Sequence, residues 1–117
     1  MKNFVCQNPQ FDVAFLKIKA QKYGLEIPFN YRAFDLHSIA QKTYFDLNKK
    51  FLIEKEEDHS GMNLTNVLKI CGIVDPRGNH NALEDAKLTA ECFSRLVYGK
   101  NLFPEYNKYP VPEDLIK

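Results

Sequence analysis

Apolar residues along this chain occur either in short continuous runs or at helical spacing. The run at 4–6 predicts a short strand, and the run at 29–34, between Pro28 and Asp35, predicts a second one. Between these runs, one stripe of apolar residues repeats at helical spacing. Its members are Phe11, Ala14, Phe15 and Ile18. We therefore expect a helix in this interval that buries the stripe against the rest of the domain.

Capping residues mark the ends of this first helix. Asn8 can cap the helix start, and Pro9 suits the first helical position, where no amide donor is needed. Gly24 is the residue type that ends helices in the left-handed conformation. Asp12 then lies in the first turn, where the helix dipole favours a negative charge.

Three further helices are predicted downstream. Asp35, Asn63 and Asn81 should cap their starts, and Gly72 and Gly99 should end the second and third of them. The residues expected on the three buried faces are Leu36, Ile39, Ala40, Thr43, Tyr44 and Leu47; Leu64, Val67, Leu68 and Cys71; and Ala86, Ala90, Phe93, Leu96 and Val97.

Two stretches lack a helical pattern. The charged stretch 49–61 predicts a solvated loop or a helix extension. The stretch 100–117 contains Pro104, Pro110 and Pro112 and predicts an extended tail. The chain is therefore divided into a domain at 1–99 and this tail.

The order of elements predicts an α/β fold with two short strands and about four helices. Two parallel strands leave both edges and most of both faces of their sheet exposed. Either further strands are missing from this chain, or a second copy supplies them. We therefore expect self-association through the strand near Phe4, or instability without a partner.

Composition narrows the functional classes. Sixteen basic and fifteen acidic side chains leave a net charge of +1, which argues against a passive nucleic-acid coat but not against an enzyme that contacts phosphates through metal ions. Cys6, Cys71 and Cys92 lack zinc-site spacing and predict buried thiols in a reducing cytoplasm. No apolar leader or membrane-length run is present, so we expect a soluble, cytoplasmic protein with no membrane partner.

The stretch that begins at His80 carries the main candidate chemistry. If Asn81 caps the helix, His80 and Asp85 occupy positions that usually hold two apolar side chains in contact. His80 and Asp85 are polar, so two interpretations stay equally open: a functional pair, or an ordinary surface pair beside a helix cap. Asp12 holds the same position after Asn8, although acidic residues are common in first turns. Because both helix starts follow strand or loop ends, Asp12 and Asp85 can converge on one cation.

Two motifs resemble those of the DEDDh 3′–5′ exonucleases, the group that includes the proofreading subunit of bacterial DNA polymerase III. The stretch 8–16, Asn-Pro-Gln-Phe-Asp-Val-Ala-Phe-Leu, resembles their second motif. The stretch 80–86, His-Asn-Ala-Leu-Glu-Asp-Ala, resembles their third motif, H-x-x-x-x-D, and 63–73 resembles the short helix before the site. The likeness spans about residues 3 to 98.

This resemblance implies a ribonuclease-H-like fold and metal-dependent hydrolysis of nucleic-acid 3′ ends. Asp12 and Asp85 would bind Mg²⁺ or Mn²⁺, cations that take hard oxygen ligands, and His80 would be the general base. Two such ions, roughly 4 Å apart, stabilise both the attacking and the leaving oxygen. Asn8 and Phe11 would contact the substrate, with core packing as the alternative role of Phe11.

The chain departs from the family pattern at its start. The first motif, a D-x-E pair on the family's first strand, is absent, because only residues 1–7 precede the second motif. Gln7 also stands where the family often has histidine. We therefore expect the carboxyl-terminal part of such a domain, truncated or split, which binds metal weakly and cleaves little by itself. A complementing chain that carries the D-x-E strand is an expected partner.

Two other functions stay open. The remnant fold could be a non-catalytic module that binds a protein or a nucleic-acid end. A nucleophile triad of Cys71, His80 and Asp85 is a weaker alternative, because Cys71 lies on an apolar helical stripe with no local signature. The sequence does not distinguish a DNA substrate from an RNA substrate.

Overall fold

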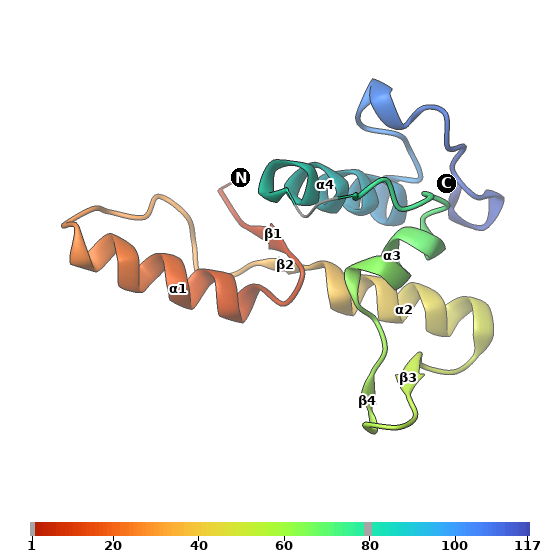
Figure 1. Cartoon of the computed structure of the whole chain (residues 1–117), viewed down its shortest axis with the longest axis horizontal. Helices are drawn as coiled ribbons and strands as arrows, with labels where there is room; N and C mark the ends of the chain where they lie inside the picture. The colour runs from red at the N-terminus through yellow and green to blue at the C-terminus, as the bar shows by residue number, and fades with distance from the viewer. Residues whose placement is uncertain (1, 79–80) are drawn as a thin grey trace.

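The computed structural model describes residues 2–78 and 81–117. Its described part contains the α-helices α1 (Pro9–Lys22), α2 (Leu36–Asn48), α3 (Leu64–Ile70) and α4 (Ala82–Tyr98). Helices α2, α3 and α4 pack together, whereas α1 projects away from them (Figure 1). No helix within the described ranges combines the length and apolarity needed to cross a membrane.

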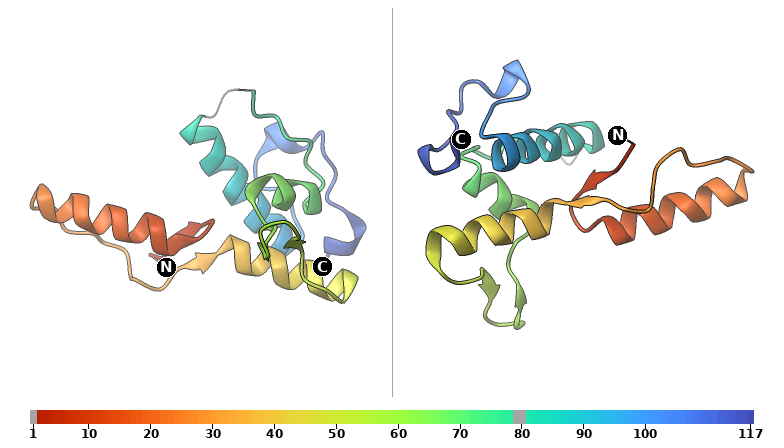
Figure 2. Two further views of the ribbon diagram at one scale, coloured as in Figure 1. Left: turned by 60° about the horizontal axis from the view of Figure 1, so that its bottom comes forward. Right: turned by 180° about the vertical axis from the view of Figure 1, so that it is seen from behind.

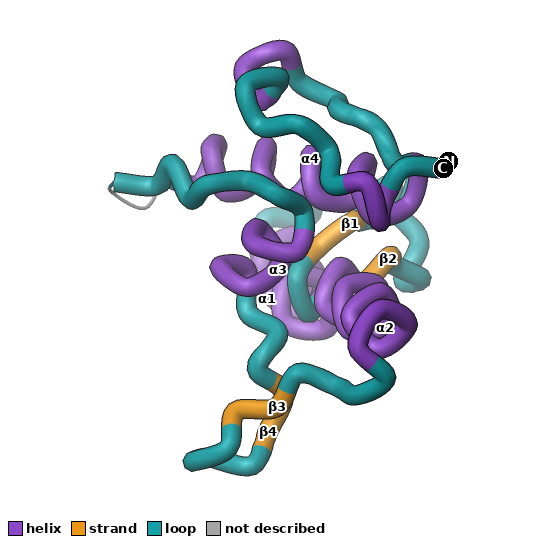
Figure 3. The backbone as a smooth tube through the Cα atoms, turned by 90° about the vertical axis from the view of Figure 1, so that its right-hand side faces the viewer, coloured by secondary structure: helices purple, strands orange, loops and turns teal. Residues whose placement is uncertain are grey.

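Two small sheets accompany the helices, which makes the fold a mixed α/β one. Strand β1 (Val5–Cys6) pairs in parallel with β2 (Phe34–Asp35), so that Val5 lies opposite Phe34 and Cys6 lies opposite Asp35. Strand β3 (Ile53–Glu54) pairs with the antiparallel strand β4 (His59–Ser60). Figure 3 shows the first sheet beside α2 and the hairpin of β3 and β4 set apart from it.

Both sheets differ from the sequence prediction. The strand predicted at 29–34 is reduced to Phe34–Asp35, because two strands with no further neighbour provide little pairing. The stretch 49–61, predicted as a loop or helix, contains the β3–β4 hairpin. Ile53 and Glu54 are both exposed, so strand β3 has no buried face and leaves no alternating pattern in the sequence.

The predicted caps of three helices are confirmed. The Asp35 carboxylate accepts bonds from the His37 amide at 3.0 Å and from the Ser38 hydroxyl at 2.8 Å. The Asn63 side chain accepts from the Asn66 amide at 2.9 Å. The Asn81 side chain accepts from the first turn of α4, at 3.0 and 3.1 Å. These bonds satisfy amide donors that have no partner inside a helix.

The start of α1 uses a different arrangement from the predicted one. Asn8 makes no side-chain cap; it adopts a left-handed conformation with φ 57°, and its amide donates to Asp35 Oδ1 at 3.1 Å. Pro9 does occupy the first helical position, and Gly24 follows the helix with φ 64°. The starts of α1 and α2 are therefore linked directly through Asp35.

The predicted buried stripe of α1 is wrong. Phe11 is 74% exposed, Phe15 is 53% exposed and Ile18 is 66% exposed. None of the residues of α1 is buried. The helix has the expected length, but no described layer covers this side of it.

The core lies between α2, α3, α4 and the C-terminal tail. Its buried apolar residues are Leu36, Ala40, Met62, Val67, Leu68, Cys71, Ile73, Leu88, Cys92, Leu96, Tyr106 and Leu115. The predicted inward faces of α2 and α3 are largely confirmed by this set. The predicted face of α4 is confirmed only in part: Leu96 is buried and Phe93 packs against the core, but Ala86 and Val97 are exposed. The charged residues Glu91 and Arg95, which were not predicted on this face, are fully buried.

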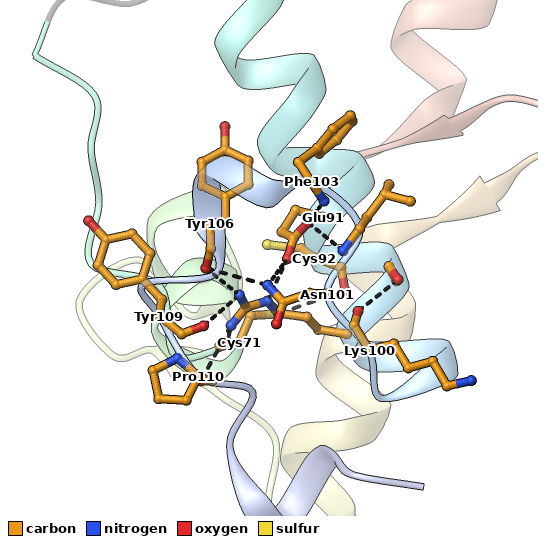
Figure 4. Close-up of polar contacts among 12 residues, drawn as sticks. Cys71, Glu91, Cys92, Lys100, Asn101, Phe103, Tyr106, Tyr109 and Pro110 are labelled. Atoms are coloured by element: carbon orange, nitrogen blue, oxygen red, sulfur yellow. Dashed lines mark hydrogen bonds and ion pairs between the residues drawn. The ribbon is translucent and has the colours of Figure 1, made fainter.

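The tail explains why α4 buries these charges. Residues 100–117 form the 3₁₀ turns η1 (Pro104–Tyr106) and η2 (Glu113–Leu115) and fold back over α4 (Figure 1). The Glu91 carboxylate accepts from the Leu102 and Phe103 amides, each at 2.9 Å (Figure 4). Arg95 donates to Glu91 and to carbonyl oxygens of the tail. The tail is thus part of the core and is held by one buried ion pair.

Candidate metal centre

A cleft of about 390 Å³ lies where β1, α1, α3 and α4 meet. It contains both carboxylates that the sequence analysis selected, although Asp12 and Asp85 belong to different helices. The lining residues are Val5, Cys6, Gln7, Asp12, Leu64, Asp85, Ala86, Thr89 and Ala90. The first turns of α1 and α4 therefore face the same space.

Local structure brings the two carboxylates to this cleft. The left-handed turn at Asn8 begins α1 directly after β1, so that Asp12 lies in the first turn beside the end of the strand. The cap at Asn81 begins α4, and the Asp85 amide donates to the Asn81 carbonyl at 2.9 Å. Because β1 contacts both α1 and α4, it brings the two helix starts together.

An arginine compensates part of the charge of Asp85. A guanidinium nitrogen of Arg77 lies 3.6 Å from Asp85 Oδ1, and the same group donates to the Asp75 carboxylate at 2.7 and 2.8 Å. The hydrogen bonds that Arg77 donates to Asp75 raise the pKa of Arg77, and the charges of Asp75 and Asp85 add to this effect. The Asp85 side chain is 34% exposed. A cation that bound there would compete with this guanidinium.

Gln7 adds an oxygen donor that the sequence analysis treated as a minor departure. Its Nε2 donates to the Met62 carbonyl at 2.7 Å, which fixes the amide group. Gln7 is one of the residues that line the cleft. Its Oε1 is buried and has no hydrogen-bond partner among the described residues. An amide oxygen of this kind is a suitable ligand for a hard divalent cation. The only sequence signal for it was its position at the end of the first strand.

The thiol of Cys6 reports the electrostatics of the cleft. Burial raises the pKa of this thiol, and the carboxylates of Asp12 and Asp35 raise it further. The carboxylates of Asp12 and Asp35 therefore make the electrostatic potential at the end of β1 negative. A negative potential beside an amide oxygen favours a cation over an anion in the cleft.

The described residues do not complete a metal site. Within residues 2–78 and 81–117, no group of three or more His, Cys, Asp or Glu side chains is placed to share a cation. His80, the predicted general base, lies outside the described residues. The side-chain oxygens in the cleft that could bind a cation are thus those of Asp12, Asp85 and Gln7, together with the hydroxyl of Thr89.

The two residues predicted to contact the substrate, Asn8 and Phe11, do not line this cleft. Asn8 lines a neighbouring cavity of about 370 Å³ together with His37, His59 and Ser60. Phe11 lines neither cavity, and its 74% exposure also excludes the alternative role in core packing.

The alternative cysteine nucleophile has an unsuitable environment. Cys71 is fully buried, and its thiol donates weakly to the Cys92 carbonyl at 3.9 Å. The hydrogen bond with Cys92 raises the pKa of the Cys71 thiol, and burial raises it further. Since the thiolate is the nucleophile, a buried thiol with a raised pKa is unreactive.

Comparisons with family models, with curated proteins and with solved structures found no match to this chain. The resemblance to the exonucleases therefore depends on the two motifs and on the cleft that contains both of their carboxylates.

Proposed function

We propose that this chain is the carboxyl-terminal part of a ribonuclease-H-like, DEDDh-type 3′–5′ exonuclease domain, which hydrolyses phosphodiesters at nucleic-acid 3′ ends with the help of Mg²⁺ or Mn²⁺. The observation that carries the proposal is the shared cleft of Asp12 and Asp85. The two residues come from separate motifs, and an unrelated pair of first-turn carboxylates has no reason to face the same space.

The donor set in the cleft suits a hard cation. Asp12 and Asp85 would supply charged oxygens and Gln7 a neutral one, all within the ligand preference of Mg²⁺. A bound cation would offset the charge of a phosphodiester and of the leaving oxygen. His80 precedes the helix that carries Asp85, and in this proposal it takes a proton from the attacking water.

The same arrangement makes the isolated chain a weak enzyme. Two carboxylates compensate little of the charge of two divalent cations, and Arg77 already offsets part of Asp85. A complementing chain with a D-x-E strand would supply the remaining carboxylates. If no such chain exists, the presence of Arg77 beside Asp85 favours the alternative function, a non-catalytic module that binds a protein or a nucleic-acid end.

Cation binding is the first test. We expect Mn²⁺, followed by electron paramagnetic resonance, to bind weakly to the wild-type chain and at least about tenfold more weakly to Asp12→Asn and Asp85→Asn. Arg77→Ala should bind more tightly, because it removes the competing charge. Asp46→Asn changes an exposed ion pair with Lys42 and is the matched control. Equal affinities in the wild type and both cleft variants would contradict the proposed site.

The Cys6 thiol provides a second readout that does not need activity. Its pKa is raised in part by Asp12, so a cation bound to Asp12 should lower that pKa and increase the rate of alkylation by iodoacetamide at neutral pH. Asp12→Asn should react faster without cation and lose the dependence on cation. Cys71 and Cys92 are fully buried and should stay unmodified in the folded protein. A rate that is independent of Mn²⁺ in the wild type would argue against a cation beside Asp12.

Hydrolysis is tested with 3′-labelled single-stranded DNA and RNA. The chain alone should release little label, and any release should be lost in His80→Ala and Asp12→Asn. If neither substitution changes either the residual hydrolysis or the biological role of the protein, the non-catalytic module becomes the better conclusion.

A further inference from the structure

The hydroxyl of Ser60 makes three hydrogen bonds at the end of β4. Its Oγ lies 2.7 Å from His37 Nε2, and it accepts from Gln41 Nε2 at 2.7 Å and from the Met62 backbone amide at 3.2 Å. His37 and Gln41 belong to α2. Figure 2 shows the stretch that leads from β4 to α3 passing beside α2 in both views. The Ser60 hydroxyl therefore ties this stretch to α2.

The donor and the acceptor of each of these bonds follow from a count of protons. The Leu52 backbone orients the Gln41 side chain, because its amide donates to Oε1 at 3.0 Å and its carbonyl accepts from Nε2 at 2.8 Å. Gln41 Nε2 and the Met62 amide are thus both donors, and they occupy the two lone pairs of Ser60 Oγ. The hydroxyl proton is left for His37 Nε2, which accepts it. With both lone pairs engaged, Ser60 is not placed to act as a nucleophile.

Two peptide groups connect Ser60 to the side chain of Gln7. The Met62 amide, which donates to Ser60, shares a planar peptide group with the Gly61 carbonyl. That carbonyl accepts from the Asn63 amide at 3.0 Å, and the Asn63 amide shares the next peptide group with the Met62 carbonyl. The Met62 carbonyl in turn accepts from Gln7 Nε2 at 2.7 Å. The position of the Ser60 hydroxyl is therefore transmitted to Gln7 through rigid groups.

The bond to Met62 decides which end of the Gln7 amide is held. Nε2 is committed to the Met62 carbonyl, so Oε1 is the end left for another group. Gln7 lines the cleft that contains Asp12 and Asp85, and its Oε1 is buried with no donor among the described residues. An amide that could turn freely would direct its NH₂ group at carboxylates, because such bonds are strong. Fixing Nε2 on Met62 keeps the oxygen available for a cation.

We propose that Ser60 is a positioning residue of the candidate metal centre: through Met62, it holds the Gln7 side chain with its oxygen available to a hard divalent cation. Ser60 does not line the cleft, so it acts on the cation only through Gln7. His37 and Gln41 contribute by orienting the Ser60 hydroxyl. The inference rests on the proposed function for the cation, and on the hydrogen bonds alone for the orientation of Gln7.

Nuclear magnetic resonance of the Gln7 side-chain amide tests this orientation without a cation. In the wild type, the Nε2 proton that donates to Met62 should be shifted well away from the other Nε2 proton, and Gln7→Leu identifies both signals by removing them. Ser60→Ala lacks the hydroxyl and should move both signals toward those of an exposed glutamine. Ser60→Thr keeps a hydroxyl and should retain the wild-type signals. The matched control is Thr43→Val, which removes a hydroxyl bonded to the Ile39 carbonyl at 3.0 Å and should also retain them.

Titration with Mn²⁺, followed by the broadening of amide signals, tests the effect on the cation. Ser60→Ala should bind Mn²⁺ about tenfold more weakly than the wild type, because substitution of a residue that orients a metal ligand typically costs about 10–100-fold in affinity. Ser60→Thr and Thr43→Val should bind as the wild type does.

Three results would overturn the role of Ser60: unchanged Gln7 signals in Ser60→Ala, the same change of signals in Thr43→Val, or a changed Gln7 side chain with unaltered Mn²⁺ affinity. A wild type that binds no Mn²⁺ would instead overturn the cation site of the proposed function. The two failures are distinguishable, because the signals of Gln7 report its orientation before any cation is added.

Discussion

Replacing Arg95 with methionine tests the ion pair that holds the tail to α4. Arg95 Nε lies 2.9 Å from Glu91 Oε1, and the other nitrogens donate to the carbonyls of Cys71, Tyr106 and Tyr109 at 2.9, 3.1 and 2.7 Å (Figure 4). Both charged side chains are 0% exposed. Methionine keeps much of the aliphatic volume but removes the charge and every one of these donors.

The expected loss of stability in Arg95→Met follows from the burial of the ion pair between Glu91 and Arg95. Removing one partner of a buried ion pair leaves an uncompensated charge and costs about 3–5 kcal/mol. The carbonyls that lose a donor increase the cost, whereas water that enters beneath a loosened tail reduces it. A domain of this length has a total stability of about 6–18 kcal/mol. Arg95→Met should therefore remove a large part of the free energy of unfolding.

Urea unfolding measures this loss. The chain contains no tryptophan, so the transition is followed by tyrosine fluorescence and by circular dichroism. With a slope of about 1–3 kcal/mol per molar urea, the midpoint should fall by at least about 1 M. Asp46→Asn breaks the exposed pair with Lys42, whose side chains are 54% and 72% exposed, and should leave the midpoint almost unchanged.

The double variant Glu91→Leu/Arg95→Met separates the charge effect from the packing effect. It should be more stable than the sum of the two single losses implies, because neither charge is left buried alone. The reasoning is refuted if Arg95→Met unfolds at the same urea concentration as Asp46→Asn, or if the two single losses add without any coupling.

Two further predictions concern the same tail. Burial, followed by the charge of Glu105, raises the pKa of Tyr106 to about 12 from about 10 in the unfolded chain. The stability that the neutral Tyr106 contributes should be complete below pH ~10 and be lost as the pH rises to ~12. Urea unfolding across this range should show the decline in the wild type and not in Tyr106→Phe. An identical decline in both proteins would contradict the raised pKa of Tyr106. A Cβ on Gly99, at φ +68°, would meet the Leu115 carbonyl oxygen at 2.5 Å, whereas one on Gly24, at φ +64°, would meet nothing within 4 Å. Gly24→Ala should therefore lose only the conformational cost of about 1–2 kcal/mol, and Gly99→Ala should lose more and loosen the tail, as thermal unfolding and limited proteolysis would report; equal losses would show that the tail contact is unimportant.

The local sequence determined where the helices begin and end. Asp35, Asn63 and Asn81 were recognised as caps from residue type alone, because a cap depends on a side chain and the amides two or three residues later. The same short-range rule placed Asp85 in the first turn of α4. Asp12 lies in the first turn of α1 because Pro9 occupies the first helical position, although the predicted cap by the Asn8 side chain is absent. The inward faces of α2 and α3 followed from spacing, since their apolar residues lie on one side of each helix.

Long-range contacts decided what the local sequence left undetermined. The buried face of α4 includes Glu91 and Arg95 only because the tail returns over it with carbonyl and amide groups that match their charges. On α1, the stripe of Phe11, Phe15 and Ile18 has the spacing of a buried face, but no segment in the described part of the chain covers it. Hydrophobic spacing reports which side of a helix prefers burial, and it carries no information on whether another segment is present to cover that side.

The candidate metal centre combines both levels. The sequence supplied Asp12 and Asp85 as two first-turn carboxylates, whereas the contacts of β1 with α1 and α4 placed them on one cleft. Only the tertiary structure added Gln7 as an oxygen donor and Arg77 as the competing charge. The physical reason is that caps and helix spacing act within a few residues, while the composition of a cleft depends on segments that meet only after the chain has folded.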